Sequence, residues 1–255
     1  MTIFQVIIAG VVEGVTEFLP VSSTGHLILL DFLFRIPTTE FVKSFNISIQ
    51  LGAILAAVVL YAKKFYLDSR LLIRVVAAFV PTAVLGLIFY KIIRAYLLGN
   101  SLIVVLALAL GGLILLIVEY WLKDRPTVGK SLESMTYREA IIIGLAQTVA
   151  MIPGVSRSAA TIIGGLLFGF SRVAIVEFSF LLAIPTMLAA TGLDLVKSSG
   201  VFSGSDWLAL IVGFMVSFLV ALLAIKWLLR YIQNHNFNPF AIYRIAVALI
   251  IWNLL

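Results

Sequence analysis

The chain has 255 residues, of which 62% are hydrophobic and 12% are charged, and its mean hydropathy is +1.16. A soluble globule of this length needs far more polar surface, so the sequence predicts an all-α polytopic membrane protein. The net charge of +6 does not indicate nucleic-acid binding, because the loop lysines and arginines of a membrane protein give the same balance. The chain contains no cysteine, which excludes disulfides and thiolate metal ligands.

Six apolar stretches are long enough, or nearly so, to cross a bilayer as helices, for which about 20 residues are needed. They are 44–62, 71–90, 102–122, 174–195, 207–229 and 240–255. Four further segments are too short or interrupted, namely 3–19, 27–36, 139–152 and 159–170. A polar cluster joins the first two of these segments, and another joins the last two. We therefore expect two re-entrant helical hairpins, over 2–36 and 139–170, whose tips are enclosed by the six spans.

The order of these elements repeats. A hairpin and three spans fill residues 1–122, a polar linker covers 123–137, and a second hairpin with three spans fills 138–255, all within one membrane domain. Residues recur at an offset of 134, as in Gly10 and Gly144, Glu13 and Gln147, and Ser22 and Ser156. Later, I-L-A-A at 54–57 resembles M-L-A-A at 187–190, one position out of step. A re-entrant hairpin returns to its own side and three spans then cross, so the second repeat is expected to be inverted.

Lysine and arginine predict the orientation of the chain. On this topology one face carries Lys63, Lys64, Arg70, Arg74, Lys123, Arg125, Lys130, Arg138, Arg172, Lys226, Arg230 and Arg244. The other face carries Arg35, Lys43, Lys91, Arg94 and Lys197. The positive-inside rule makes the first face cytoplasmic and places both termini outside. The first hairpin then enters from outside and the second from the cytoplasm.

The first polar cluster, E-G-V-T-E-F-L-P-V-S-S-T-G-H, runs from Glu13 to His26 inside an apolar stretch. Glu13 and Glu17 are four residues apart on a predicted helix, so their carboxylates project from one face. Two such groups in a poorly solvated site share either a proton or a cation. Carboxylate oxygens suit Mg²⁺ or Ca²⁺, with water and substrate phosphate completing the shell. The alternative is that both are protonated packing residues or helix caps.

Hydroxyl groups follow at the start of the second short helix. Pro20 ends the first helix, and Ser22, Ser23 and Thr24 then lie at a helix N-terminus, which is a ready anion site. These hydroxyls serve either as caps alone or as caps that also bind phosphate. His26, beside two glutamates and a hydroxyl run, is a candidate general acid or base, or a nucleophile. Taken alone it would be a hydrogen-bonded core histidine.

The second cluster, P-G-V-S-R-S-A-A-T from Pro153 to Thr161, has the same pattern with an arginine at its tip. A guanidinium at membrane depth needs an anion, so Arg157 either pairs with Glu13 or Glu17 or binds phosphate in a bidentate manner. Gly154 and Ser156 belong to the same predicted phosphate site. Ser158 and Thr161, three residues apart, would add hydroxyl donors along one helix face.

Other polar residues in the spans are weaker candidates. Asn46 and Gln50 share one helix face and either line the cavity or bond between helices, and Gln147, the counterpart of Glu13, is a further candidate lining residue. Acidic residues near span or hairpin ends are expected at the membrane interface. They are Asp31, Glu119, Glu177 and Asp194. His235 lies in a polar loop and is expected outside the site.

Several motifs together carry a family resemblance. The two clusters, I-Q-L-G-A-I-L-A at 49–56, E-F-S-F-L-L-A-I-P at 177–185 and P-F-A-I-Y-R at 239–244 closely resemble the undecaprenyl-pyrophosphate phosphatase family, also called bacitracin-resistance proteins. The match spans nearly the whole chain. Its two signatures, E/Q-x-x-x-E and P-G-x-S-R-S-x-x-T, are highly specific in combination. One departure is Asn46, which stands where some members carry an acidic residue and so argues against an essential carboxylate there.

The resemblance implies a divalent-metal hydrolase of the bacterial cytoplasmic membrane. It would convert undecaprenyl pyrophosphate to the monophosphate, recycling the lipid carrier for cell-wall synthesis and conferring bacitracin resistance. By motif position, Glu13 and Glu17 fill the acidic signature, His26 the histidine, and Ser156 and Arg157 the phosphate-binding signature. For the nucleophile we rank Ser23, activated by Glu17 or His26, before a metal-bound water and His26 itself.

Two other function classes compete with this reading. Inverted repeats with broken helices are also transporter architecture, so a polyprenyl-phosphate transporter or flippase is the main alternative. A type 2 phosphatidic-acid phosphatase would need a later histidine with an aspartate four residues on, but Pro239 stands four residues after His235. The preferred cation, the prenyl length and homodimer formation are left open by the sequence.

Overall fold

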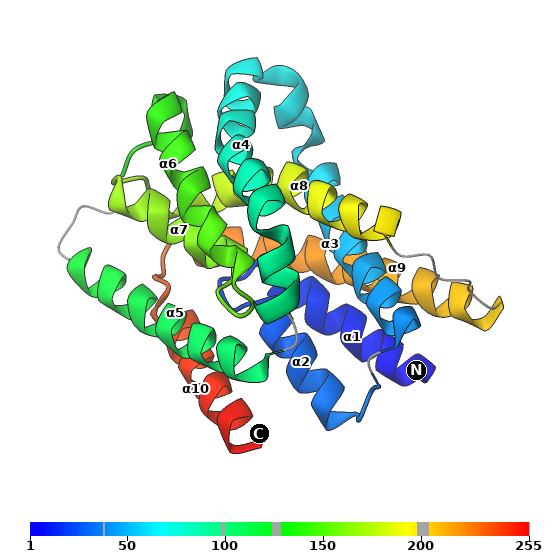
Figure 1. Ribbon diagram of the computed structural model, residues 1–255. Coiled ribbons are helices and arrows are strands. Elements are labelled where there is room, and N and C mark those ends of the chain that lie inside the picture. Colours follow the sequence, from blue (N-terminus) through cyan, green and yellow to red (C-terminus); the bar gives the residue numbers. More distant parts are fainter. Residues whose placement is uncertain (38, 98–99, 124–128, 198–203, 255) are drawn as a thin grey trace.

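The computed structural model describes residues 1–37, 39–97, 100–123, 129–197 and 204–254. Within these ranges the chain is helical, as predicted (Figure 1). The α-helices are α1 Ile3–Thr16, α2 Ser23–Leu33, α3 Glu40–Leu67, α4 Ser69–Ile92, α5 Ser101–Trp121, α6 Tyr137–Thr148, α7 Arg157–Leu167, α8 Arg172–Lys197, α9 Gly204–Tyr231 and α10 Asn238–Leu254. A π-helical turn at Ile93–Leu97 follows α4, and short 3-10 turns lie at Leu132–Ser134 and Val149–Met151.

Five helices in the described part of the chain are long and apolar enough to cross a bilayer. They cover Glu40–Lys64, Ser69–Ile92, Ser101–Trp121, Arg172–Leu193 and Asp206–Tyr231, and coincide with the first five predicted spans. The chain is therefore a polytopic membrane protein. The sixth predicted span corresponds to α10, which has 17 residues. At 1.5 Å per residue α10 is about 25 Å long, which is slightly less than the hydrocarbon thickness.

The four short apolar segments form two pairs of helices with matching ends. Thr2 caps α1 in a capping box with Gln5, and Thr136 caps α6 in a capping box with Glu139. Where the helix is interrupted in each pair, a serine with positive φ stands at the N-cap of the second helix; Ser156 Oγ accepts a hydrogen bond from the backbone N–H of Ala159, whereas Ser22 makes no side-chain cap hydrogen bond. Ser22 before α2 and Ser156 before α7 both have φ of 71°, a conformation that side chains rarely adopt. Each pair of equivalent residues is separated by 134 positions, as the sequence echoes predicted.

The helices of the two halves exchange partners. The first hairpin helix α1 packs along α9 of the second half, and α6 packs along α4 of the first half. Glycines permit both contacts, because a Cβ at Gly10 would lie 2.9 Å from the carbonyl oxygen of Gly213, and one at Gly144 would overlap the carbonyl of Ala78. The third long helices, α5 and α10, pack against each other. Two units related by a two-fold axis would make this pattern of contacts, which supports the predicted repeats.

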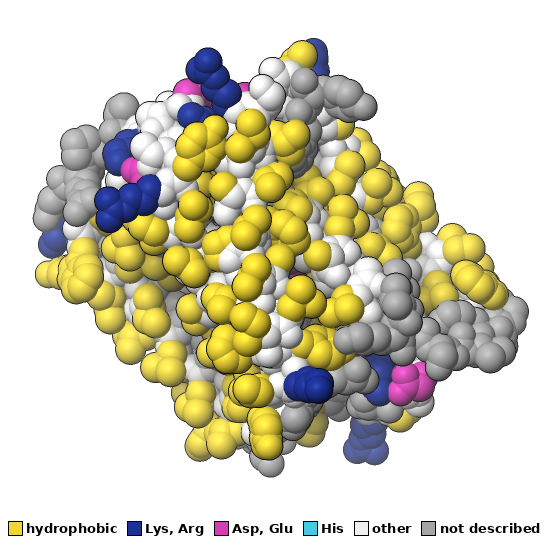
Figure 2. All heavy atoms as spheres, turned by 45° about the horizontal axis from the view of Figure 1, so that its top comes forward, with side chains coloured by type: hydrophobic (Ala, Val, Ile, Leu, Met, Phe, Trp, Pro, Cys, Tyr) yellow, Lys and Arg dark blue, Asp and Glu magenta, His cyan; other side chains and the backbone are white. Residues whose placement is uncertain are grey.

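Basic residues gather at one end of the molecule. There Lys64 pairs with Glu177 at 2.6 Å, Lys130 pairs with Glu139 at 2.8 Å, and Arg74 donates to the carbonyl oxygen of Leu132. Figure 2 shows apolar side chains covering the middle of one face, with charged side chains at its upper left and lower edge. An apolar band between two polar ends is the surface that a bilayer requires. Of the residues used to predict the orientation, Arg125 and the side chains of Arg94 and Lys197 lie outside the described part.

One sequence expectation about a charged residue is wrong. Arg244 was expected on the basic face, but its side chain is wholly buried in the interior. Glu119 lies in the last turn of α5, near the span end as expected, but it is only 3% exposed and accepts hydrogen bonds from Arg172 and from the backbone N–H of Phe237. Both residues find enclosed polar partners in the tertiary structure, and these compensate the loss of water. The side chain of Asp194 lies outside the described residues.

Candidate active site

A cavity of about 500 Å³ lies where the two hairpin tips meet the long helices. The predicted site residues that line it are Glu17, Ser22, Ser23, Thr24, Gln50, Gln147, Gly154, Ser156 and Arg157. Many of the other lining residues are apolar and come from α4, the turn after it and α8, including Leu87, Ile93, Met187 and Leu193. The cavity therefore combines a polar floor with an apolar wall, as an amphiphilic ligand would need.

The polar floor is organised around the carboxylate of Glu17. This residue ends α1, and the turn 18–21 brings Ser23, at the start of α2, back beside it. Ser23 Oγ donates to Glu17 Oε2 at 2.6 Å, and Arg157 Nη2 donates to Glu17 Oε1 at 3.1 Å. Both carboxylate oxygens are engaged, and the three side chains are largely buried. The structure thus joins residues from the two predicted clusters in one hydrogen-bonded group.

The guanidinium of Arg157 is held on both sides. Its Nη1 donates to the carbonyl oxygen of Ser179 at 2.9 Å and to Ser179 Oγ at 3.2 Å. Its Nε is buried and has no hydrogen-bond partner in the described structure. Of the two predicted alternatives, the ion pair of Arg157 with Glu17 is present, and phosphate binding stays a prediction for a side chain that lines the cavity beside Ser156. A charged group with a spare donor next to a cavity is equipped to bind an anion.

The tautomer of neutral His26 follows from its partners. Nδ1 lies 2.8 Å from the carbonyl oxygen of Ser22, which can only accept, so Nδ1 carries the proton. Nε2 lies 2.8 Å from the hydroxyl of Tyr243 and accepts its hydrogen bond. The two rings are stacked with centroids 5.4 Å apart. Both nitrogens are therefore occupied, and Glu17, not His26, contacts the Ser23 hydroxyl.

Glu13 lies one helical turn before Glu17 and does not line the cavity. Its side chain is wholly buried, and neither carboxylate oxygen has a hydrogen-bond partner among the described residues. Unpartnered buried oxygens are costly, so they mark a place where a proton, a water or a cation would be stabilising.

Ser158 and Thr161 contact the protein itself. Ser158 Oγ donates to the carbonyl oxygen of Leu19 at 2.8 Å and thereby joins the two hairpins. Thr161 Oγ1 lies 2.7 Å from Ser179 Oγ and 3.1 Å from the carbonyl oxygen of Arg157. Both are wholly buried and neither lines the cavity, and half-buried Asn46 is also absent from its wall. Ser158 and Thr161 therefore hold Arg157 and the two hairpin tips in place through these hydrogen bonds.

Some residues of the site were not singled out from the sequence. Thr82 and Thr186 are two of them, and their hydroxyls accept hydrogen bonds from Nε2 of the predicted lining residue Gln147 at 2.9 and 3.1 Å, which fixes this amide at the cavity wall. Ser179 and the two neighbours Tyr243 and Arg244 also contact the hairpins. The family motifs at 239–244 and 177–185 contain Tyr243, Arg244 and Ser179, so the resemblance could have indicated these three residues. Thr82 and Thr186 lie outside the family motifs, and no sequence pattern indicated them.

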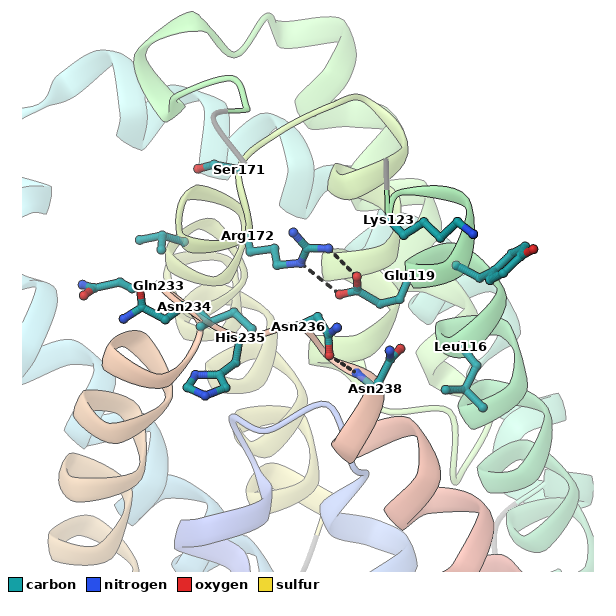
Figure 3. Close-up of a pocket in the computed structure, with 13 residues that line it drawn as sticks. Leu116, Glu119, Lys123, Ser171, Arg172, Gln233, Asn234, His235, Asn236 and Asn238 are labelled. Carbon is teal, nitrogen blue, oxygen red and sulfur yellow. Dashed lines mark hydrogen bonds and ion pairs between the residues drawn. The ribbon is translucent and has the colours of Figure 1, made fainter. Parts of the chain in front are cut away.

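A second cavity, of about 730 Å³, opens at the basic end (Figure 3). It is lined by the loop 233–236, by Asn238 and by Glu119, Lys123 and Arg172. The carboxylate of Glu119 is already paired with the Arg172 guanidinium, and His235 lies here, outside the hairpin site as predicted. Because residues of both predicted polar clusters line the hairpin cavity and none lines this one, we place the candidate active site at the hairpin cavity.

Comparisons with known proteins identify the family of the chain. The profile of the family described as bacitracin resistance protein BacA matches residues 6–250. The chain is 49% identical over 250 residues to a protein of Aquifex aeolicus named undecaprenyl-diphosphatase, covering 98% of this chain and 97% of the relative. Proteins with the same name from Sulfurihydrogenibium sp. and Thermus thermophilus are 52% and 45% identical, over 98% and 96% of this chain and 98% and 94% of their own lengths. The chain therefore belongs to the bacitracin resistance protein BacA family.

Proposed function

We propose that this protein is an integral-membrane undecaprenyl-diphosphatase. It removes the terminal phosphate from a polyprenyl pyrophosphate and releases the monophosphate, recycling the lipid carrier for cell-wall synthesis and conferring bacitracin resistance. The name shared by its relatives and the match over nearly the whole chain support this activity. The observation that carries it is the group of Ser23, Glu17 and Arg157 on the floor of a cavity with an apolar wall.

The contacts of Ser23 suggest how its hydroxyl acts. Glu17 accepts the Ser23 hydrogen bond, so it can take the proton as Ser23 Oγ attacks the terminal phosphorus. The bond from that phosphorus to the bridging oxygen breaks, and the polyprenyl monophosphate leaves. Water then hydrolyses the phosphoserine and releases orthophosphate. Arg157, which lines the cavity beside Ser156, stabilises the charge on the transferring phosphoryl group.

We further propose that a divalent cation, Mg²⁺ or Ca²⁺, is held by Glu13 and Glu17. The carboxylate of Glu13 supports this, because both of its oxygens lack a hydrogen-bond partner and carboxylate oxygens are ligands that these cations prefer. When bound, the cation would neutralise charge on the diphosphate. Gly154, Ser156, Ser22 and Thr24 line the same cavity at two helix N-termini, where backbone N–H groups favour phosphate.

We propose the membrane arrangement predicted from the sequence. Six spans, with α10 as the sixth, and two re-entrant hairpins form two inverted repeats, over 1–122 and 138–255, joined by the linker 123–137. Both termini lie outside, and the cavity opens toward the outer face of the cytoplasmic membrane. The exchanged packing of α1 on α9 and α6 on α4 supports the repeats, and the basic end supports the facing.

The activity is tested by phosphate release from a polyprenyl pyrophosphate in detergent, with Mg²⁺, Ca²⁺ or a chelator. We expect cation-dependent release that falls at least about a hundredfold in Glu17→Ala and in Arg157→Ala, because each change removes a charge that acts in the transition state. Glu40→Ala and Arg138→Ala, which alter exposed residues, are the matched controls and should retain the wild-type rate. Near-normal turnover in Arg157→Ala would overturn the phosphate-binding role.

The same preparation separates hydrolysis from transport. Reconstituted into vesicles, a hydrolase releases orthophosphate without net movement of the lipid between leaflets. If well-folded protein released no phosphate, and a Glu17→Ala variant still moved polyprenyl phosphate across the bilayer, the transporter alternative would replace the phosphatase.

A further inference from the structure

Arg244 is a fully buried cation in the middle of α10. No ion pair joins it to an acidic residue in the part of the chain that the structure describes. Its guanidinium donates only to backbone carbonyl oxygens, at 3.3 Å to Pro20, 3.1 Å to Gly154, 3.2 Å to Ala107 and 3.4 Å to Leu108. A buried charge is tolerated only when it is fully hydrogen-bonded, so these four carbonyls are what holds it there.

Two of these acceptors belong to the hairpin tips. Pro20 lies in the break between α1 and α2, and Gly154 lies in the break between α6 and α7, so neither carbonyl serves a helix. The described structure offers no backbone donor to either oxygen. Arg244 therefore satisfies one carbonyl in each tip that would otherwise be buried without a partner.

The two carbonyls are equivalent by sequence. Pro20 and Gly154 are separated by 134 positions, the same offset that relates Ser22 to Ser156. Each carbonyl stands two residues before its serine and three residues before Ser23 or Arg157. A single guanidinium thus holds both tips at matching points, immediately before the residues that face the cavity.

The neighbouring helix leaves room for this one side chain. A Cβ at Gly111 of α5 would overlap the guanidinium of Arg244. Gly111 is separated from Arg244 by 133 positions, the offset that also relates 54–57 to 187–190. One arginine and one glycine therefore occupy equivalent places on α10 and α5, and two arginines would collide there.

From these contacts we infer that Arg244 is a positioning residue that sets the separation of the two hairpin tips, and with it the distance from Ser23 to Arg157. It contacts neither Ser23 nor the cavity. The catalytic consequence rests on the proposed phosphatase function, whereas the spacing of the tips does not. Lysine would keep the charge, but its single ammonium cannot reproduce the planar fork that reaches carbonyls on three different segments.

The experiment measures tip spacing and turnover separately. Because the chain has no cysteine, cysteines at the exposed and equivalent positions Val15 and Val149 give one pair of spin labels beside the two tips. The labelled protein is first shown to hydrolyse substrate, and the distance distribution is then recorded by double electron–electron resonance in detergent. Arg244→Lys and Gly111→Ala are compared with Arg230→Lys, which alters an exposed arginine.

We expect a broadened or shifted distance distribution in Arg244→Lys and in Gly111→Ala, and none in Arg230→Lys. In the folded fraction from size-exclusion chromatography, kcat should fall about a hundredfold in the first two variants while KM changes little, since misplacement of reacting groups by about 1 Å has that effect.

An unchanged distance distribution in both variants would overturn the inference, whatever the activity. Loss of all folded protein in both would also overturn it, because Arg244 would then support the whole fold. If the spacing of the tips changed in Arg244→Lys and Gly111→Ala but neither the wild type nor any variant hydrolysed substrate, the proposed function would be wrong and the positioning role of Arg244 would stand.

Discussion

Ser23 and His26 lie three residues apart on α2, yet their polar atoms have different partners. Ser23 contacts Glu17, whereas His26 is held between the Ser22 carbonyl and Tyr243. From the sequence, Ser23 was the preferred nucleophile, and either Glu17 or His26 could be its general base. Because hydrogen-bond contact is the first requirement of a general base, the geometry favours Glu17 for that role.

This arrangement predicts unequal effects of two conservative substitutions. Ser23→Ala removes the proposed nucleophile, and we expect kcat to fall at least about a thousandfold, as for nucleophile loss in serine hydrolases. Tyr243→Phe removes only the donor to His26 Nε2, and we expect a loss of no more than about tenfold, the value of one net hydrogen bond. Steady-state phosphate release measures both, with Tyr137→Phe at an exposed tyrosine as control. A Ser23→Ala enzyme with near-normal kcat would remove Ser23 from the mechanism.

At the scale of helices, close approach decides which elements meet. The short helix α6 touches α4 at Gly144, and Thr82 Oγ1 of α4 donates to the carbonyl oxygen of Gly144 at 3.0 Å. The same α6 carries Gln147 at the cavity wall. Packing at this glycine therefore positions one side of the site.

Two glycine substitutions test this packing. Gly144→Ala places a methyl group against the Ala78 carbonyl, and we expect a loss of about 1–3 kcal/mol in stability, as for overpacked cores. Gly192→Ala in α8 enters open space, and we expect a gain of up to about 1 kcal/mol from helix propensity. Thermal unfolding in detergent compares them, and Tm should move in opposite directions. Equal Tm values would show that α4 and α6 can move apart to accept the methyl group without loss of stability.

One face of the molecule presents an apolar band between two charged ends (Figure 2). The ion pairs Lys64–Glu177 and Lys130–Glu139 bring long helices, a short helix and the linker together at the basic end. On the positive-inside rule we propose that this end faces the cytoplasm.

Single cysteines in the cysteine-free chain test this facing. We expect Glu40→Cys to react with a membrane-impermeant maleimide in intact cells and Ser134→Cys to react only after permeabilisation, since these exposed residues lie at opposite ends. Labelling is read by gel shift, with the cysteine-free protein as blank. The reverse pattern would place the basic end outside, and labelling of both residues in intact cells would indicate dual insertion.

Much of the fold could be predicted because bilayer crossing imposes a strong local pattern. The runs 44–62 and 102–122 are long apolar stretches, and both became long helices, α3 and α5. The short segments beside Pro20 and Pro153 became broken helices because proline and hydroxyl residues interrupt the apolar run. The depth of Arg244 could not be predicted, since the charge count treats every arginine near the end of a span as interfacial.

The sequence by itself determined the class of protein, the helical segments, the two polar clusters and the family, because each of these is written in local composition or in short motifs. Only the tertiary structure decided which polar atoms meet. It placed Ser23 and Arg157 on the two oxygens of one carboxylate, tied His26 to Tyr243, and put Arg244 between Pro20 and Gly154. These partners are up to 224 residues apart, and hydrogen bonds act over about 3 Å. No local pattern carries that information, and only the packing of distant helices supplies it.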